Sequence, residues 1–249
     1  MPLELARHDV HLDHLDPAHE GLVIAHLTDV HVGLMTPWRK IRRAVAMANL
    51  ARPDVIVLTG DYLCYSPKHV PLMGEALSGL QASTAVVATL GNHDHWTDAT
   101  GCAAALKRNG YDVLRNQNLT VRARGADLTL VGIDDAITRH HDPARAFTGV
   151  PGRARTVVTL THCPELADAA AARGSSLTVA GHTHGGQIRF KNIEKVYRRV
   201  SRRRYLYGWY PVGDSLLYVS SGVGSSSIPI RAGRGGRAEV AVFTLRRPR

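Results

Sequence analysis

Short apolar runs alternate with segments of helical periodicity along most of the chain. The apolar runs, typical of buried strands, are GLVIAHL (21–27), DVIVLTG (54–60), TAVVATLG (84–91), DLTLVGI (127–133), RTVVTLTH (155–162) and SLTVAGH (176–182). Apolar residues recur at helical intervals in 38–51, 68–81, 98–110 and 164–174, with Pro53 and Gly110 as stop signals. Two more strand-like runs, 215–222 and 238–245, lie near the C-terminus. This order predicts one layered α/β domain over residues 1–249.

Polar residues that can bind metals recur where five of these runs end. The five sequences are TDVH (28–31), GDY (60–62), GNHD (91–94), THCP (161–164) and GHTH (181–184). Each sequence alone is compatible with an ordinary helix cap or turn. Ligand sites gather at the carboxyl ends of strands in α/β sheets, so five such endings together predict a site at one sheet edge.

The side chains offered by these sequences are two carboxylates, four imidazoles and one amide. They are Asp29, Asp61, His31, His162, His182, His184 and Asn92. Mixed oxygen and nitrogen ligands suit Mn, Fe or Zn, with Co or Ni as alternatives, and the lack of cysteine argues against a closed structural zinc site. Seven ligands are too many for one ion and fit two ions if one carboxylate bridges them.

The ordered motifs DxH, GD, GNHD, H and GHxH resemble the calcineurin-like metallophosphoesterase superfamily over about residues 22–184. The resemblance implies a four-layer α/β/β/α sandwich and a phosphoesterase in which a metal-bound hydroxide attacks phosphorus. Asp61 would bridge the two metals. The ligands implied for one metal are Asp29, His31 and His184, and those for the other are Asn92, His162 and His182. His93 would protonate the leaving oxygen or clamp the phosphoryl group, and Asp94 would orient His93.

Longer stretches, among them GNHDHW, THCPELAD and GHTHGGQI, are similar to the YaeI/YkuE-type branch of bacterial phosphodiesterases. Tyr62 and Leu63 follow the GD motif where many members have Asp or Asn, which favours this branch over the protein Ser/Thr phosphatases. Some relatives of the branch hydrolyse UDP-diacylglucosamine in lipid A synthesis, so a pyrophosphatase of that kind is one alternative. A non-catalytic phosphate-binding or anionic-lipid-binding protein is another, but such a protein would be expected to lack a ligand or His93.

The chain is basic, with 31 Lys and Arg against 21 Asp and Glu, and a formal net charge of +10. This balance favours anionic partners. Basic residues concentrate in an insertion at about 189–210, where Arg198 and Arg202 are candidate contacts for substrate or for an anionic membrane surface. A solvated basic helix is the alternative for this segment. Because the charge is local rather than spread along a groove, the sequence predicts no specific nucleic-acid partner.

Several other histidines are not among the predicted metal ligands. His95 follows the GNHD motif, and His140 and His141 follow the run 127–133, so all three are candidate substrate contacts. Four more, His8, His11, His14 and His19, are expected at the surface. Three cysteines without CxxC spacing and an N-terminus without a signal-like pattern predict a cytoplasmic protein, peripheral to the inner membrane face if the basic insertion binds lipid. The oligomeric state stays open.

Overall fold

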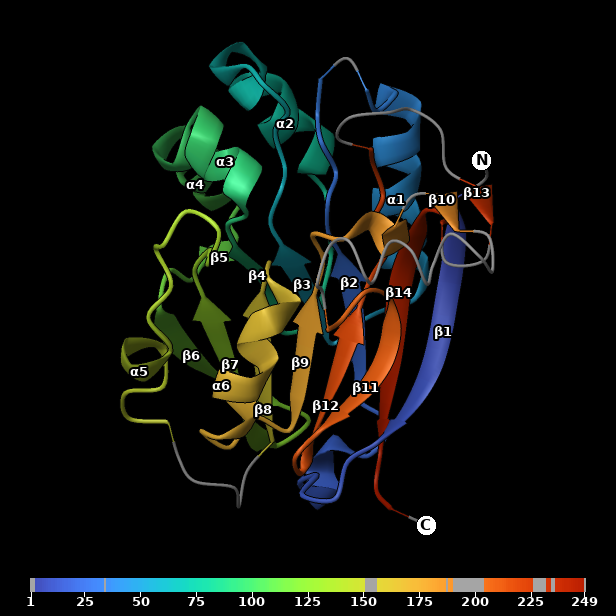
Figure 1. Cartoon of the computed structure of the whole chain (residues 1–249). Coiled ribbons are helices and arrows are strands. Elements are labelled where there is room, and N and C mark those ends of the chain that lie inside the picture. Colours follow the sequence, from blue (N-terminus) through green and yellow to red (C-terminus); the bar gives the residue numbers. More distant parts are fainter. Residues whose placement is uncertain are drawn as a thin grey trace.

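Two six-stranded sheets pack face to face in the computed structural model of the chain (Figure 1), which describes residues 3–33, 35–150, 156–186, 188–189, 204–225, 232–233 and 236–248. The first sheet has the order β1 (Glu4–His11), β14 (Glu239–Arg246), β2 (Val23–Leu27), β3 (Val55–Thr59), β4 (Ala85–Thr89) and β5 (Asp112–Val113). The second has the order β11 (Gly208–Val212), β12 (Ser215–Val219), β9 (Leu177–Ala180), β8 (Val157–Thr161), β7 (Ala126–Ile133) and β6 (Gln117–Ala123). A small separate pair joins β10 (Ile188–Arg189) to β13 (Ala232–Gly233).

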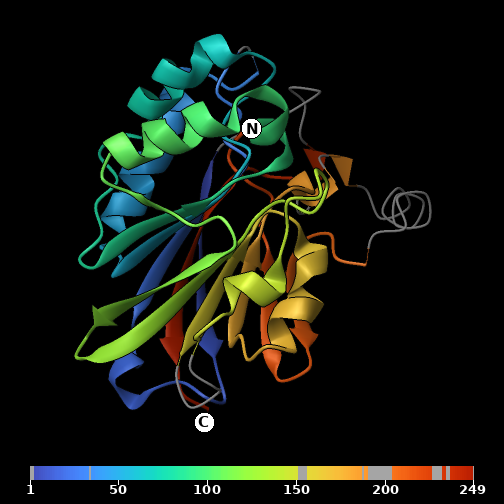
Figure 2. The same cartoon turned by 90° about the vertical axis from the view of Figure 1, so that its left-hand side faces the viewer.

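Helices cover the outer face of each sheet (Figure 2). Against the first sheet pack α1 (Trp38–Leu50), α2 (Val70–Leu77) and α4 (Ala99–Arg108), and α3 (Asn92–Thr97) lies just before α4. Against the second sheet pack α5 (Pro143–Ala146) and α6 (Ala167–Ala171). The predicted α/β/β/α sandwich is therefore confirmed.

Three apolar layers explain the continuous apolar runs of the central strands. One core joins α1 and α2 to the first sheet, for example through Ile41, Met73 and Ile56. A second core fills the space between the sheets and includes Val57 and Leu160. A third lies between the second sheet and the helices α5 and α6. Because each central strand is covered on both faces, successive side chains are apolar rather than alternating. In α1 the buried residues recur at helical spacing, at positions 41, 44, 45 and 48.

The strands and long helices predicted from the sequence are present with small shifts at their ends, but six strands and two helices of the described residues were not predicted. The missed elements are β1, β5, β6, β10, β11, β13, α3 and α5. Strand β1 pairs in parallel with β14 from Glu4 opposite Glu239 to His11 opposite Arg246. It is an edge strand rich in charged residues, so its composition resembles a solvated segment.

The surface expectation for the N-terminal histidines is wrong at two positions. His8 is half-buried against the rings of Trp209, Tyr218 and Phe243. His19 is buried, and its Nδ1 lies 2.9 Å from the Thr156 hydroxyl. His11 and His14 are exposed.

The strands that run in parallel bring their carboxyl ends to one edge of the molecule. In the first sheet β2, β3 and β4 are parallel neighbours, and in the second β7, β8 and β9 are. In Figure 1 these strands point towards the helices α2, α3 and α4 at the top. Within the part of the chain that the structure describes, no helix is both long and apolar enough to cross a membrane.

Candidate metal centre

Loops from both sheets converge at this edge and bring the predicted ligands together. Asp29 and His31 follow β2, Asp61 follows β3 and Asn92 begins the helix after β4. From the second sheet, His162 follows β8 and the GHTH loop follows β9. The side chains form two groups positioned to hold a metal ion: Asp29, His31 and His184, and Asp61, His162 and His182.

The first group is compact and buried. The Nε2 atoms of His31 and His184 lie 3.0 Å apart. Asp29 Oδ1 lies 3.3 Å from His184 Nε2 and 3.9 Å from His31 Nε2. Two imidazole nitrogens and one carboxylate oxygen thus face a common point, which is the donor set and arrangement that a transition-metal ion requires.

The second group is equally close. His162 Nε2 lies 3.2 Å from Asp61 Oδ2, and His182 Nδ1 lies 3.2 Å from His162 Nε2. Asn92 is buried, and its Oδ1 accepts no hydrogen bond within the described residues. A buried amide oxygen normally has a partner, so the Asn92 oxygen suits a cation as its missing partner.

Asp61 lies between the two groups. Its Oδ2 is 3.6 Å from His31 Nε2 in the first group and 3.2 Å from His162 Nε2 in the second. Its Oδ1 accepts a hydrogen bond from the backbone N–H of His93 at 2.9 Å. This position fits a carboxylate that is shared by two cations.

Hydrogen bonds from the surrounding residues fix the orientation of the ligand side chains. His162 Nδ1 lies 2.8 Å from the backbone carbonyl oxygen of Thr59, which leaves Nε2 free to bind a metal. The Thr28 hydroxyl donates to Asp29 Oδ2 at 2.8 Å, and the backbone N–H of His182 donates to the same carboxylate. Such outer contacts set the tautomer and direction of metal ligands.

The ligand loops are held in an unfavourable backbone conformation. Of the ten non-glycine residues with positive φ in the described chain, five are predicted ligands: Asp29 (53°), His31 (49°), Asp61 (55°), His182 (72°) and His184 (51°). The left-handed conformation costs roughly 1–2 kcal/mol for a residue that carries a Cβ. Strain of this kind persists only where the surrounding structure imposes it, and it concentrates at functional sites.

Two glycines allow the loops to approach one another. A Cβ on Gly91 would overlap the Asp61 carboxylate and crowd the His162 ring. A Cβ on Gly181 would overlap the Thr28 hydroxyl and the Asp29 carboxylate. Close packing against ligand side chains therefore requires glycine at the first position of the GNHD and GHTH motifs.

The buried carboxylates and imidazoles of the cluster shift the pKa values of one another. Burial raises the pKa of Asp29 to about 6. Burial alone would lower the pKa of His162, but the Asp61 carboxylate outweighs this effect and raises it to about 10. Burial would likewise raise the pKa of Asp61, but His162 holds it well below its usual range. Because a histidine binds a metal through its neutral ring, a metal ion at this site would compete with a proton on His162.

The Asp94 carboxylate contacts the backbone on both sides of the centre. It accepts hydrogen bonds at 2.8–3.1 Å from four backbone N–H groups, those of Asp61, Tyr62, Leu63 and Gly91. The side chain therefore fixes the loop after β3 and the start of α3. The role implied by the family resemblance, that Asp94 orients His93, stays a prediction, and the contacts described for the carboxylate are to backbone N–H groups.

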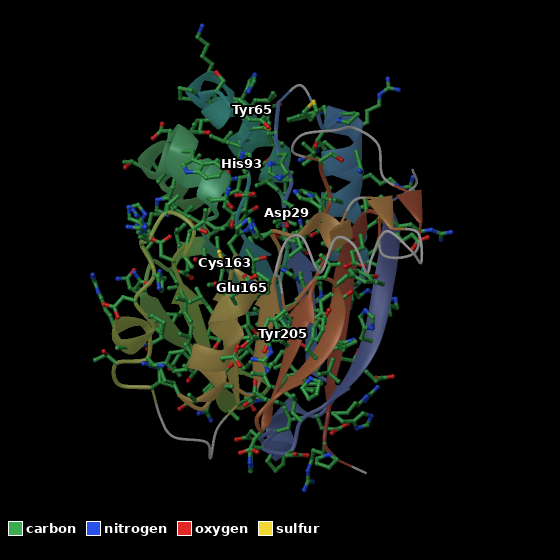
Figure 3. The ribbon with its side chains drawn as sticks, viewed as in Figure 1. Asp29, Tyr65, His93, Cys163, Glu165 and Tyr205 are labelled. Atoms are coloured by element: carbon green, nitrogen blue, oxygen red, sulfur yellow. The ribbon has the colours of Figure 1, made fainter. Side chains whose placement is uncertain are left out.

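His93 lies beside the two groups. Its half-buried ring is 4.9 Å from the ring of His31, edge to face, and it approaches the rings of Tyr65 and Trp96 at 5.7 and 5.1 Å. The side chain belongs to neither of the two ligand groups described above. Figure 3 shows His93 between Tyr65 and Asp29 at this end of the molecule.

Cys64 is a residue near the centre that the sequence analysis did not select. Its thiol is buried and lies near His31 and His93. The three side chains form a further group that could hold a metal ion. Burial raises the pKa of this thiol to about 11. No spacing signal in the sequence marks Cys64, because its approach to His31 depends on how the two loops after β2 and β3 run side by side.

The other candidate contacts separate into two sets. His95 Nε2 lies 2.7 Å from Asp134 Oδ1, and its ring stacks on that of His140 at 4.1 Å. Arg115 donates to the same Asp134 carboxylate. Arg115, Asp134 and His140 line a pocket beside His95, and both His140 and His141 are exposed. Arg198 and Arg202, with most of the basic insertion, lie outside the described residues.

This architecture and this set of candidate metal ligands point to a phosphoesterase family. The chain belongs to the calcineurin-like phosphoesterase family, whose model matches residues 22–186.

Individual relatives support this assignment. The chain is 26% identical to the metallophosphoesterase YkuE of Bacillus subtilis, over 98% of this chain and 86% of that protein. It is 29% identical to the phosphodiesterase YaeI of Escherichia coli, over 81% of this chain and 75% of that protein. It is also 31% identical to a transmembrane protein with metallophosphoesterase domain of Bos taurus, over 95% of this chain and 56% of that protein.

Solved structures share the fold. The NAD nucleotidase of Haemophilus influenzae matches with a TM-score of 0.53 and 12% identity, over 81% of this chain and 50% of that chain. The 5'-nucleotidase precursor of Thermus thermophilus matches with a TM-score of 0.51 and 15% identity, over 82% of this chain and 49% of that chain. This chain thus spans about half of each of these structures.

Proposed function

We propose that the protein is a dimetal phosphodiesterase. The observation that carries the proposal is the position of the Asp61 carboxylate, whose Oδ2 faces a histidine nitrogen of each ligand group. One ion would be held by Asp29, His31 and His184, and the other by Asn92, His162 and His182, with Asp61 shared. Mn, Fe and Zn fit this set of oxygen and nitrogen ligands best, and Co or Ni also fit it.

When bound, such a pair of ions polarises a phosphoryl oxygen and lowers the pKa of a bound water to near neutrality. The protein's own residues supply the remaining functions. The ring of His93 packs directly against the ring of His31. From this position His93 would donate a proton to the departing oxygen of a substrate bound at the centre. Asp94 keeps the loop that carries Asp61 in register with α3.

Charge favours a diester over a monoester. Two dications and the carboxylates of Asp29 and Asp61 leave a formal charge of about two positive units, since the other ligands are neutral when they bind metal. One hydroxide and one diester monoanion neutralise that charge. A monoester dianion would leave the buried site negative. The name of YaeI, a phosphodiesterase, agrees with this preference.

Metal-reconstituted assays test the proposal. The metal-free protein is loaded in turn with Mn, Fe or Zn and assayed with bis(4-nitrophenyl) phosphate and 4-nitrophenyl phosphate. We expect chelator-sensitive hydrolysis with a higher kcat/KM for the diester. A preference for the monoester would overturn the phosphodiesterase assignment. UDP-diacylglucosamine in the same panel tests the pyrophosphatase alternative. Failure of every metal with every substrate would instead favour a non-catalytic phosphate-binding protein.

A further inference from the structure

Two exposed aromatic side chains lie beside His93, next to the candidate metal centre. Tyr65 is 68% exposed and Trp96 is 63% exposed. Both rings nevertheless pack against the same neighbour, because each meets the His93 ring edge to face at 5.7 and 5.1 Å. The His93 ring in turn lies 4.9 Å from the ring of the predicted ligand His31. His93 therefore lies between the two aromatic side chains and the ligand group.

The elements that hold the ligands also hold these aromatics. Tyr65 lies in the loop after β3, which carries Asp61, and its φ of 64° is left-handed. Burial of the ring cannot account for this unfavourable backbone, because most of the ring faces solvent. Trp96 lies on α3, which begins with Asn92 and is tied to the second sheet by the 2.7 Å contact of His95 with Asp134.

We propose that Tyr65 and Trp96 bind a planar group, an aryl ring or a nucleobase, that is attached to the phosphorus of the substrate. This inference deepens the proposed function and rests on it. A group that leaves the phosphorus on the His93 side meets the two rings first. Aromatic side chains stack on flat groups with little dependence on their exact identity, which suits exposed rings on both sides of a polar histidine.

An alkyl chain is the rival occupant, and the geometry favours it less. A chain requires a continuous apolar surface along its length, whereas the polar His93 ring contacts both Tyr65 and Trp96. A planar group with polar edges can stack on one ring and still reach His93. The two occupants are separated by ligands that share a phosphonate head.

Calorimetric binding of three phosphonates to the manganese-loaded chain tests the proposal. The ligands are methylphosphonate, phenylphosphonate and octylphosphonate. We expect phenylphosphonate to bind about tenfold more tightly than methylphosphonate. Trp96→Ala and Tyr65→Ala should each reduce this ratio several-fold, and Trp96→Phe should restore most of it. The matched control is Trp38→Ala, which removes another exposed tryptophan without a described ring contact to His93 and should keep the ratio.

An unchanged ratio in both alanine variants would overturn the proposal, and so would an equal fall in Trp38→Ala. Octylphosphonate could instead gain more affinity over methylphosphonate than phenylphosphonate does, and lose this gain in the alanine variants. That result would assign the rings to an alkyl chain. The readout is binding rather than turnover. A chain that shows the expected ratios but hydrolyses no ester would therefore contradict the proposed function and leave this site in place.

Discussion

Two regions of the molecule are rich in histidine, and they use it differently. In the N-terminal segment, His8 packs on three aromatic rings and His19 contacts a threonine hydroxyl. At the carboxyl edge of the sheets, His31 and His162 lie 3.2–3.6 Å from the Asp61 carboxylate. In the described residues, the ion-pair contacts of histidine involve the strand-end histidines and His95, and none involves the N-terminal segment.

The difference shows what turns histidines into a metal site. Burial alone does not do so, because His19 is as buried as His162. The decisive features are a shared carboxylate and a strained loop that points the ring nitrogens at one another. The ligands Asp61 and His184 have left-handed backbones, whereas His8 lies in a regular strand.

Removal of the shared carboxylate should have the largest effect. In Asp61→Ala both sites lose a ligand and the two cations lose the anion between them, so hydrolysis should fall by at least about 10³-fold. Metal content and kcat/KM of the purified variant check this. His14→Ala, which changes an exposed N-terminal histidine, should behave as the wild type. Full metal content in Asp61→Ala would refute the shared-ligand assignment.

His93→Ala separates a histidine that acts at the centre from one that binds metal. Both ions should remain, while kcat for an ester with a poor leaving group should fall by about 10²–10⁴-fold. The loss should be smaller for bis(4-nitrophenyl) phosphate, since nitrophenolate needs little protonation. Equal losses for both leaving groups would argue for phosphoryl clamping and against proton donation.

Asp94→Asn tests how the centre is supported. In the wild type, backbone N–H groups donate to the Asp94 carboxylate. The amide of the variant turns donor hydrogens towards some of these N–H groups, which cannot accept them, so the loop after β3 should shift. Loss of such outer contacts typically lowers metal affinity by about 10–100-fold. The control Asp98→Asn alters a carboxylate that caps α4 through Gly101 and does not contact that loop. Zinc competition titrations of both variants decide the matter, and equal affinities would contradict the supporting role.

A histidine of the sheet core gives the smallest expected effect, on stability. Burial of His26 against Thr59 lowers its pKa to about 3 from 6.5. The unfolded chain therefore takes up a proton as pH falls below about 6.5, while the folded chain does not until pH approaches 3. At pH 5 the free energy of unfolding should be roughly 2 kcal/mol lower than at pH 7 from this group.

Urea denaturation at pH 7 and pH 5 measures this contribution. His26→Gln retains a hydrogen-bonding side chain without a titrating group, so its stability should change less with pH than that of the wild type. The matching variant His14→Gln, at an exposed position, should keep the wild-type dependence. The same acid sensitivity in His26→Gln as in the wild type would refute the assignment.

The sequence indicated which polar side chains would lie close together, because the signal is local. Asp29, Asn92 and His162 each come within a few residues of an apolar run, and parallel strands bring such positions to one edge. Contacts between loops were not predictable in this way. Cys64 reaches His31 only because the two loops lie side by side, and Asp94 binds backbone N–H groups some thirty residues away in sequence.

The first strand was missed for a different reason. Strand β1 pairs at the edge of a sheet, so only some of its side chains are buried and its charged residues conceal the pattern. Its half-buried His8 belongs to an aromatic cluster drawn from β1, β11, β12 and β14. A single strand read alone does not show which distant rings will cover it.

The central claim is that seven side chains at the strand ends hold two ions with Asp61 between them. Anomalous diffraction from zinc-loaded crystals tests it most directly. The account predicts two peaks per chain about 3.5–4 Å apart. One should lie about 2.0–2.2 Å from ligand atoms of Asp29, His31 and His184, the other at that distance from Asn92, His162 and His182, and both should contact Asp61. A single peak, or two peaks that do not share Asp61, would contradict it.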